Sequence, residues 1–324
     1  MAKNPTVRRY KAADAPRWNE FISQARNATF LYNRGFMDYH ADRFEDYSLI
    51  VSSGDKWMAV LPAHRKDNMV LSHWGLTYGG LVYGDVRQSD VIAILKAVLE
   101  FLADGGIDAL RIKLLPRIYT QKPSDELAYA LFLADAKLIR RDSLSVIDQV
   151  FGINAVRDRL NGIKRGQKSG ITIKEEQDFS AFWNHILIPN LQKRYNTMPV
   201  HSLAEIELLH SRFPNNIRQF NVYNDDQIVA GTTLFVSRNV VHSQYISANT
   251  SKNKLGSLDF LYNYLIDFFR DIRYFDFGIS NESEGQKLNE GLIYWKESFG
   301  ATTVTHDFYE VETKNFVLLD DVLI

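Results

Sequence analysis

The sequence predicts an α/β protein, in the α+β sense of mixed sheets flanked by helices, built from two similar domains. Two observations support this prediction: strand-like and helix-like periods alternate along the chain, and the same order of elements occurs twice. In the first half, helical periods span residues 13–25 and 89–102, and the strand-like runs are YSLIVSS, WMAVLPA and ALRIKLL. In the second half, helical periods span residues 257–269 and 289–299, and the strand-like runs are IRQFNVY, IVAGTTLFV, VVHSQYISA and RYFDFG.

We place the division between the halves near residue 153, which gives domains at residues 1–153 and 154–324. A chain of 324 residues exceeds the usual size of one compact domain, and this agrees with a duplication. A repeat of this length indicates duplicated domains rather than a solenoid, whose units span about 20 to 50 residues.

Composition and charge narrow the classes of function. The net charge of −1 and the pI near 6.7 give no overall attraction to nucleic acid or to an anionic membrane. The absence of cysteine excludes disulfides, thiolate metal sites and a cysteine nucleophile, and it fits a reducing compartment. No stretch approaches the about 20 apolar residues of a membrane span, and no signal-peptide pattern is present. We therefore expect a cytoplasmic protein.

Several chemistries lack sequence support. The chain has no H-E-x-x-H, G-x-S-x-G, Walker or G-x-G-x-x-G motif, so zinc proteolysis, serine hydrolysis and nucleotide hydrolysis are disfavoured, and we expect no metal site.

Residues 240–269 predict a strand, a polar loop and a helix, an arrangement that can bind phosphate. Backbone N–H groups at a helix start attract an anion. Gly256 lets the backbone approach closely, Ser257 is placed to cap the helix, and Lys252 and Lys254 add positive charge. The same residues are ordinary for a helix start, so this loop alone leaves both interpretations open.

A basic stretch, RDRLNGIKRGQKSG at residues 157–170, follows the predicted division. Its apolar residues are too sparse for a buried helix. The stretch could contact phosphates of a nucleotide or of coenzyme A, or it could be a solvated helix face that follows an interdomain linker.

His73 is the first candidate for a general base. It lies in LSHWGLTYGGL, where three glycines allow a tight loop. In the same loop, Trp74 and Tyr78 could stack on a base or a sugar ring. A hydrogen-bonded structural role for His73 is the alternative.

His242 and Asp276 are the other candidates for the base. The odd spacing between His242 and Tyr245 predicts that these side chains point to opposite faces of their strand. Asp276 alternates with Phe275 and Phe277, so its carboxylate is expected to face away from a buried aromatic surface. A buried hydrogen-bonding role is the alternative for both.

The segment RYFDFGISNESEGQKLNEGLIYWKESFGATTVTHDFYEV resembles the C-terminal part of FemAB-like members of the GNAT acyltransferase superfamily. The resemblance extends through HSLAEIELLHSRFPNNI, IVAGTTLF and HSQYISA, and in the first half through FLYNRGFMDYHADRFEDYSLIV and SHWGLTYGGL. It implies two tandem GNAT-like domains, each a mixed, mostly antiparallel sheet flanked by helices. Within this branch, the chain is most similar to sugar N-acyltransferases that acylate a dTDP-linked amino sugar for surface polysaccharides.

This resemblance implies a donor site and a catalytic lysine. GNAT enzymes bind the coenzyme A pyrophosphate with the pattern Q/R-x-x-G-x-G/A, and here Asn253, Gly256 and Leu258 occupy its three defined positions. The lysine that is thought to stabilise the transferred acyl group in cell-wall members matches Lys296. A surface lysine paired with Glu297 or Glu290 is the alternative.

The resemblance also implies an acceptor site. Arg194, Tyr195 and His201 match a region that contacts the acceptor in the cell-wall members, and an arginine fork suits a diphosphate. Arg34 and Tyr39 could reach the same cleft from the first domain. Packing or surface salt bridges are the alternative for these residues.

The sequence therefore predicts direct transfer of an acyl group from acyl-coenzyme A to the amine of a nucleotide-linked sugar, without nucleic acid or membrane as partner. Two alternatives stay open: a Fem-type ligase that uses aminoacyl-tRNA and a peptidoglycan precursor, and a non-catalytic scaffold. The segment WGLTYGGLVYGD has glycines but no basic residue, so we expect no cofactor site in the first domain.

Overall fold

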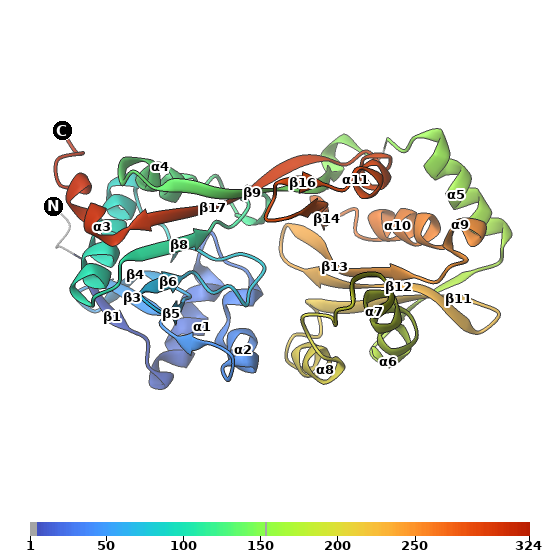
Figure 1. Ribbon diagram of the computed structural model, residues 1–324, viewed down its shortest axis with the longest axis horizontal. Helices are drawn as coiled ribbons and strands as arrows, with labels where there is room; N and C mark the ends of the chain where they lie inside the picture. Colours follow the sequence, from blue (N-terminus) through green and yellow to red (C-terminus); the bar gives the residue numbers. More distant parts are fainter. Residues whose placement is uncertain (1–4, 153) are drawn as a thin grey trace. The chain divides into compact units, whose positions relative to one another are not determined.

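The structure is a computed structural model that describes residues 5–152 and 154–324 (Figure 1). The backbone forms two compact units. Unit 1 contains the chain up to Asp142 together with Thr305–Ile324, and unit 2 contains Ser143–Val304. The chain passes from unit 1 to unit 2 within strand β9 (Lys137–Asp148), and it passes back to unit 1 within strand β17 (Thr302–Glu312). The units are thus not two consecutive segments divided near residue 153, which itself lies outside the described residues, because β17 returns the chain to unit 1.

Unit 1 combines two groups of strands with helices. One sheet has the order β1-β3-β4-β7, and the other strands follow the order β17-β8-β6-β5-β2. The strands are β1 (Thr6–Arg9), β2 (Glu45–Asp46), β3 (Leu49–Ser53), β4 (Lys56–Leu61), β5 (His64–Lys66), β6 (Met69–Leu71), β7 (Val82–Tyr83) and β8 (Ala109–Lys113). The helices are α1 (Ala15–Gln24), α2 (Arg34–Met37), α3 (Gln88–Asp104) and α4 (Glu126–Leu133).

Unit 2 has the strand order β10-β11-β12-β13-β14, with the C-terminal half of β9 beside β14. The strands are β10 (Thr172–Glu176), β11 (Ile217–Asn224), β12 (Gln227–Val236), β13 (Val240–Ala248), β14 (Tyr274–Ile279), β15 (Asn281–Glu282) and β16 (Lys287–Leu288). The helices are α5 (Arg157–Lys168), α6 (Ser180–Phe182), α7 (Ile188–Tyr195), α8 (Leu203–Arg212), α9 (Lys252–Leu255), α10 (Ser257–Phe268) and α11 (Glu290–Glu297).

Each unit contains a parallel pair of strands joined by a crossover helix. In unit 1 the order is β6, α3 and β8, and in unit 2 it is β13, α10 and β14. The crossover helices are amphipathic, and their apolar faces form the cores. In unit 2, Leu261, Tyr262 and Leu265 of α10 pack with Phe275 and Phe277 of β14. The alternation of periods in the sequence predicted the crossover helices and the strands that follow them, but it did not predict the parallel pairing.

The two faces of the unit 2 sheet carry different helices. Figure 1 shows α10 on one side of β11–β13 and α6, α7 and α8 on the other. The second side is packed closely, since a Cβ added to Gly231 of β12 would overlap the ring of Phe182. Helix α5, which was expected to be too polar for burial, packs on α10 through Gly162 and Gly166. Within the described residues, no helix is both long enough and apolar enough to cross a membrane.

Candidate active site

Three of the predicted catalytic side chains meet where β13 and β14 separate. The two parallel strands are in register only from Val240 to His242 and from Tyr274 to Asp276, although β13 continues to Ala248. The last paired residues are His242 and Asp276. We call this region, formed by His242, Asp276, Gly278 and Lys296, the unit 2 fork.

His242 and Asp276 form a hydrogen-bonded pair in the unit 2 fork. Nδ1 of His242 lies 2.9 Å from Oδ2 of Asp276, whose side chain is 1% exposed. The other carboxylate oxygen, Oδ1, accepts a hydrogen bond of 2.7 Å from the backbone N–H of Gly278. Since Asp276 is held at both oxygens, it fixes the orientation of the imidazole and leaves Nε2 as the ring nitrogen that can take up a proton. Phe275 and Phe277 face the aromatic core, as their alternation with Asp276 predicted.

Lys296 is buried in the same fork. Its Nζ donates to the carbonyl oxygens of Gly278, at 2.9 Å, and Ile279, at 2.7 Å. Gly278 has a φ of 74°, and the register with β9 is interrupted between Asp276 and Ile279, so this glycine makes the irregularity that turns both carbonyls toward the lysine. The alternative of a surface lysine paired with Glu290 or Glu297 is wrong, because only 2% of Lys296 is exposed. Burial lowers the pKa of Lys296 to about 8, against an opposing effect of Asp276.

Tyr245 lies on the same face of β13 as His242, which corrects the prediction of opposite faces. His242 is the partner of Phe235, and Tyr245 is the partner of Thr233, and these two residues of β12 are two positions apart. The strand contains a bulge in which Gln244 is the extra residue, so the parity of the side chains changes there. Spacing alone could not reveal this bulge.

Tyr245 is paired with His201, another predicted site residue. The phenol oxygen of Tyr245 lies 2.7 Å from Nδ1 of His201 and accepts the backbone N–H of the same residue at 3.2 Å. Burial raises the pKa of Tyr245 to about 12, so the phenol stays protonated near neutral pH. The ring of Trp183 packs edge-on against Tyr245. The structure therefore brings His201, Tyr245 and His242 to one face of the sheet.

Comparison with known proteins finds a similarity for the part of the chain that contains this fork. Residues 156–296 match the family model described as "Acetyltransferase (GNAT) domain". The matched residues lie within unit 2, which is therefore similar to a GNAT domain. No curated protein matches the sequence.

Solved structures extend the likeness to the whole chain at the level of fold. FemX has 11% identity and a TM-score of 0.66, with 97% of this chain and 99% of FemX covered. The C-terminal domain of a putative lysylphosphatidylglycerol synthetase from Agrobacterium fabrum has 13% identity and a TM-score of 0.58, with 96% of each chain covered. L-PGS from Bacillus licheniformis has 10% identity and a TM-score of 0.56, again with 96% of each chain covered. The tandem GNAT-like architecture predicted from the sequence is confirmed.

The predicted phosphate loop of unit 2 is partly covered. Lys252, Asn253 and Lys254 lie on α9 with accessible side chains. Gly256 and Ser257 are buried, and a Cβ added to Gly256 would overlap the carbonyl oxygen of Gly162 on α5. The prediction that Ser257 caps α10 is wrong: Gly256, with a φ of 69°, is the N-cap residue, and Oγ of Ser257 has no hydrogen-bond partner in the described part of the chain.

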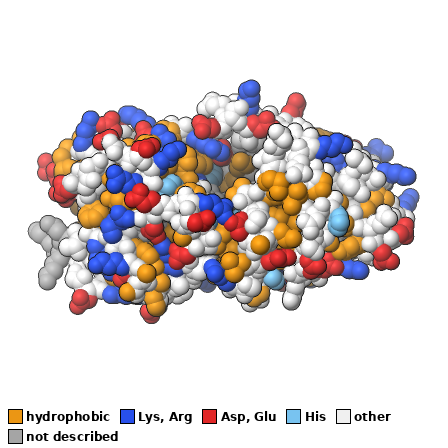
Figure 2. Space-filling model, turned by 60° about the horizontal axis from the view of Figure 1, so that its bottom comes forward, with side chains coloured by type: hydrophobic (Ala, Val, Ile, Leu, Met, Phe, Trp, Pro, Cys, Tyr) orange, Lys and Arg blue, Asp and Glu red, His pale blue; other side chains and the backbone are white. Residues whose placement is uncertain are grey.

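Arg194 and Tyr195 lie at the exposed end of α7, which stops at Asn196 in the left-handed conformation. The connection that follows exposes two further apolar side chains, Met198 and Val200. Figure 2 shows that hydrophobic side chains are exposed among charged ones on the face of the molecule drawn there. Arg194 and Tyr195 are thus accessible to a ligand, while His201, a few residues later, is buried.

The residues predicted around His73 form a closed cluster in unit 1. His73 has a φ of 52° and packs against the rings of His40, Phe44 and His64. Burial lowers its pKa to about 2, which makes it a very weak base. Trp74 is 42% exposed. Tyr78 is buried between aromatic rings and donates to Oγ1 of Thr29 at 3.0 Å, so its ring is not available for the stacking that we expected.

Arg34 and Tyr39 serve the packing of unit 1. The guanidinium of Arg34 is buried, forms ion pairs with Asp38 and Asp46, and lies 3.9 Å from the ring centre of Tyr10. The ring of Tyr39 contacts those of Phe36 and His40. In this structure the guanidinium of Arg34 is already saturated by two carboxylates, which differs from the expected free acceptor contact.

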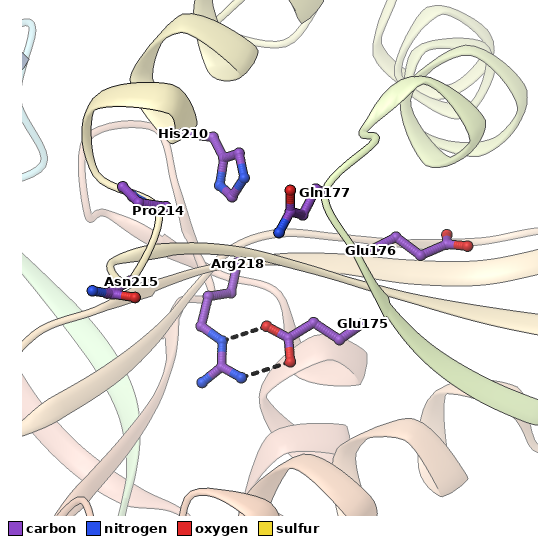
Figure 3. A pocket seen from close by; sticks show the side chains of 7 residues that line it. All are labelled: Glu175, Glu176, Gln177, His210, Pro214, Asn215 and Arg218. Carbon is purple, nitrogen blue, oxygen red and sulfur yellow. Dashed lines mark hydrogen bonds and ion pairs between the residues drawn. The ribbon is translucent and has the colours of Figure 1, made fainter.

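A pocket of about 620 Å³ lies elsewhere on unit 2, at the edge formed by β10 and β11 (Figure 3). Its lining residues are Glu175, Glu176, Gln177, His210, Pro214, Asn215 and Arg218. Arg218 is held by both oxygens of Glu175, at 2.6 and 2.7 Å. None of these residues belongs to the unit 2 fork, so the pocket does not define the chemistry. Among the described residues, no group of three or more His, Asp or Glu side chains could hold a metal ion.

Two features of unit 2, one in the fork and one on α10, were not predicted as part of the site. Gly278 supplies a carbonyl to Lys296 and an N–H to Asp276, and the FDFG run in the sequence was the available signal for it. Asp259 of α10 binds Arg159 of α5 and the indole N–H of Trp295 at 2.9 Å. No local pattern indicated this contact, because its partners lie far apart in the sequence.

Proposed function

We propose that this protein is an N-acyltransferase that moves an acetyl or 3-hydroxybutanoyl group from coenzyme A to the amine of a dTDP-linked amino sugar. The product would serve O-antigen or capsule synthesis. The observation that supports this proposal best is the unit 2 fork, where a histidine–aspartate pair and a buried lysine lie within a GNAT domain.

The residues of the fork suit direct attack by an amine on a thioester. Nε2 of His242 removes a proton from the acceptor ammonium, and Asp276 stabilises the imidazolium that forms. The free amine attacks the thioester carbonyl, which becomes a tetrahedral oxyanion. Lys296 uses two of its three N–H donors on the carbonyls of Gly278 and Ile279, and the third can stabilise the oxyanion. The intermediate expels the thiolate, the former amine nitrogen loses its extra proton as the amide forms, and the thiolate takes up that proton, so the C–S bond is replaced by a C–N bond.

The test combines the purified protein with acetyl-CoA or 3-hydroxybutyryl-CoA and a dTDP-amino sugar. We expect thiol release that depends on the amino sugar, and a sugar product whose mass has increased by the acyl group. The control acceptor is the corresponding dTDP-sugar with a hydroxyl in place of the amine. Equal thiol release with both acceptors, and no acylated sugar, would show that the amine is not the nucleophile.

A second donor class is supported by one observation, the cover that α5 places over the first turn of α10. GNAT enzymes bind the coenzyme A pyrophosphate at that turn, and here it is not open. A Fem-type transfer from aminoacyl-tRNA to a peptidoglycan precursor would keep the same attack on an activated carbonyl. In that case the leaving group is a ribose hydroxyl rather than a thiol, and the thiol assay stays silent while aminoacyl-tRNA is consumed.

A further inference from the structure

Helix α5 carries a row of basic side chains on its outer face. Arg157, Lys164 and Lys168 are 7 and 4 positions apart, so they lie within about 20° of one line along a helix about 18 Å long. Arg165 lies beside this line. All four are exposed, and within the described part of the chain none forms an ion pair.

The inner face of α5 fixes this row against the start of α10. A Cβ added to Gly162 would overlap the carboxylate of Asp259, and one added to Gly166 would overlap the side chain of Phe260. Gly162 also meets Gly256, the residue between α9 and α10. The basic row is therefore carried by a helix whose backbone touches the loop that leads from β13.

The first turn of α10 already contains an anion of the protein itself. The carboxylate of Asp259 lies in that turn, where it binds Arg159 and the indole of Trp295. A carboxylate at this position satisfies the positive end of the helix dipole. A diphosphate at the same place would meet like charge and the backbone of α5.

The nearest uncompensated positive charge lies outside this turn, on α5 and α9. Helix α9 adds Lys252 and Lys254, and neither forms an ion pair in the described chain. The two helices together hold seven basic residues, five on α5 and two on α9, against one acidic residue, Asp158. This local excess contrasts with a net charge of −1 for the whole chain.

We propose that the phosphates of the acyl donor bind on the outer surface of α5 and α9, instead of at the first turn of α10. This inference rests on the proposed acyl transfer, since it assigns the binding site of that reaction's donor. Three residues connect the end of β13 at Ala248 to α9, so the phosphates of a donor bound there lie near the strand that forms the fork. The phosphates belong either to coenzyme A or to the phosphodiester chain of an aminoacyl-tRNA.

The test compares Lys164→Gln/Lys168→Gln with the control Lys56→Gln/Lys66→Gln, which removes the same charge from exposed positions of unit 1. The probes are coenzyme A, 3′-dephospho-coenzyme A and a short single-stranded RNA ending in CCA. Binding is measured by calorimetry at low and moderate salt, after thermal melting has shown that both variants fold. We expect the α5 variant to bind one probe roughly tenfold more weakly, with a smaller salt dependence, while the control variant binds like the unchanged protein.

The choice of probe separates the two donors. The surface belongs to a thioester donor if the α5 variant binds coenzyme A more weakly than the unchanged protein does, and if the unchanged protein itself binds 3′-dephospho-coenzyme A weakly. It belongs to an aminoacyl-tRNA if the α5 variant loses affinity for the RNA alone. Equal binding by the α5 variant and the control, or no binding of either probe by the unchanged protein, would overturn the proposal. If the unchanged protein binds a probe normally but does not turn over, the proposed chemistry fails while the binding surface stands. His242→Ala removes the proposed base and leaves this surface intact, so it should bind the probe normally.

Discussion

The two units contain the same parallel fork, but only in unit 1 does a loop of the chain fold back into it. In unit 1, β6 pairs with β8 over three residues, as β13 pairs with β14 in unit 2. In unit 1 the chain then turns back into its own fork: the N–H of Ser72 donates to the carbonyl of Arg111 at 2.9 Å, and the N–H of Gly79 to that of Lys113 at 2.7 Å. In unit 2, β13 instead continues as a strand paired with β12. A loop closes the first fork, and His242, Asp276 and Lys296 line the second.

Each fork also holds a buried lysine, and the partners of the two lysines differ. Burial lowers the pKa of Lys113 to about 7 and that of Lys296 to about 8. Lys113 donates to the carbonyl of Leu76, within the loop that closes the fork. Lys296 lies beside the carboxylate of Asp276, which also binds His242. A buried lysine is therefore common to both units, while the histidine–aspartate pair is found in unit 2.

The largest effect that would sharpen this comparison is expected from the two histidines. His242→Ala should lower kcat by about 10² to 10⁴-fold, because it removes the proposed general base. His73→Asn should leave kcat unchanged, because asparagine tolerates the positive φ of this residue and the ring of His73 lies in the closed cluster of unit 1. Single-turnover rates at saturating donor measure both. If His73→Asn were the slower variant, the active fork would be assigned to the wrong unit.

The sequence predicted the elements better than their connections. The strand from 240 to 248 was predicted at its observed bounds, because its β-branched and aromatic residues lie between clear turn signals. The return of β17 to unit 1 was not predicted, since strand partners far apart in the sequence leave no local signal. The helix at 157–168 was judged too polar for burial, because its contact with α10 is made by glycines, which carry no hydrophobic signal.

The site shows the same limit. His242, Asp276 and Lys296 were identified as candidates, and the structure brings them together. The sequence could not rank them above His73, because the difference between the two histidines depends on burial. The sequence also could not show that the guanidinium of Arg34 is bound by Asp38 and Asp46 and does not point freely toward a ligand.

The next effect concerns the two lysines and pH. Lys296→Met should lower kcat by about 10²-fold at pH 7, because the oxyanion loses an ammonium donor. In the unchanged protein, kcat should fall as pH rises above about 8, where Lys296 loses its proton, and this decline should be absent in Lys296→Met. The unchanged protein and Lys296→Met are measured with the same acceptor, so the titration of the acceptor amine affects both pH profiles equally. Lys113→Met should keep both kcat and the decline, and a rate that instead rises through pH 8 would assign Lys296 as a base.

The contribution of Lys296 to the free energy of unfolding should rise with pH over the range in which kcat falls. The pKa of Lys296 is about 8 in the folded protein and 10.5 as the ordinary value, so the unfolded chain binds more protons between these limits. The free energy of unfolding of the unchanged protein should therefore rise from pH 8 to pH 10.5 relative to Lys296→Met. Urea titrations at both pH values measure this difference, and a difference that shrank instead would place the ammonium in a site that favours its charge.

The smallest expected effect on turnover comes from opening the closed fork of unit 1. A Cβ added to Gly79 would overlap the carbonyl oxygen of Ser72, so Gly79→Ala should cost about 1 to 3 kcal/mol of stability. Gly84→Ala is the matched control, because open space surrounds that glycine and its φ is not in the left-handed region. Chemical denaturation measures the loss, and kcat per folded molecule should stay unchanged in both variants. A fall in kcat for Gly79→Ala alone would mean that the closed fork of unit 1 also supports catalysis.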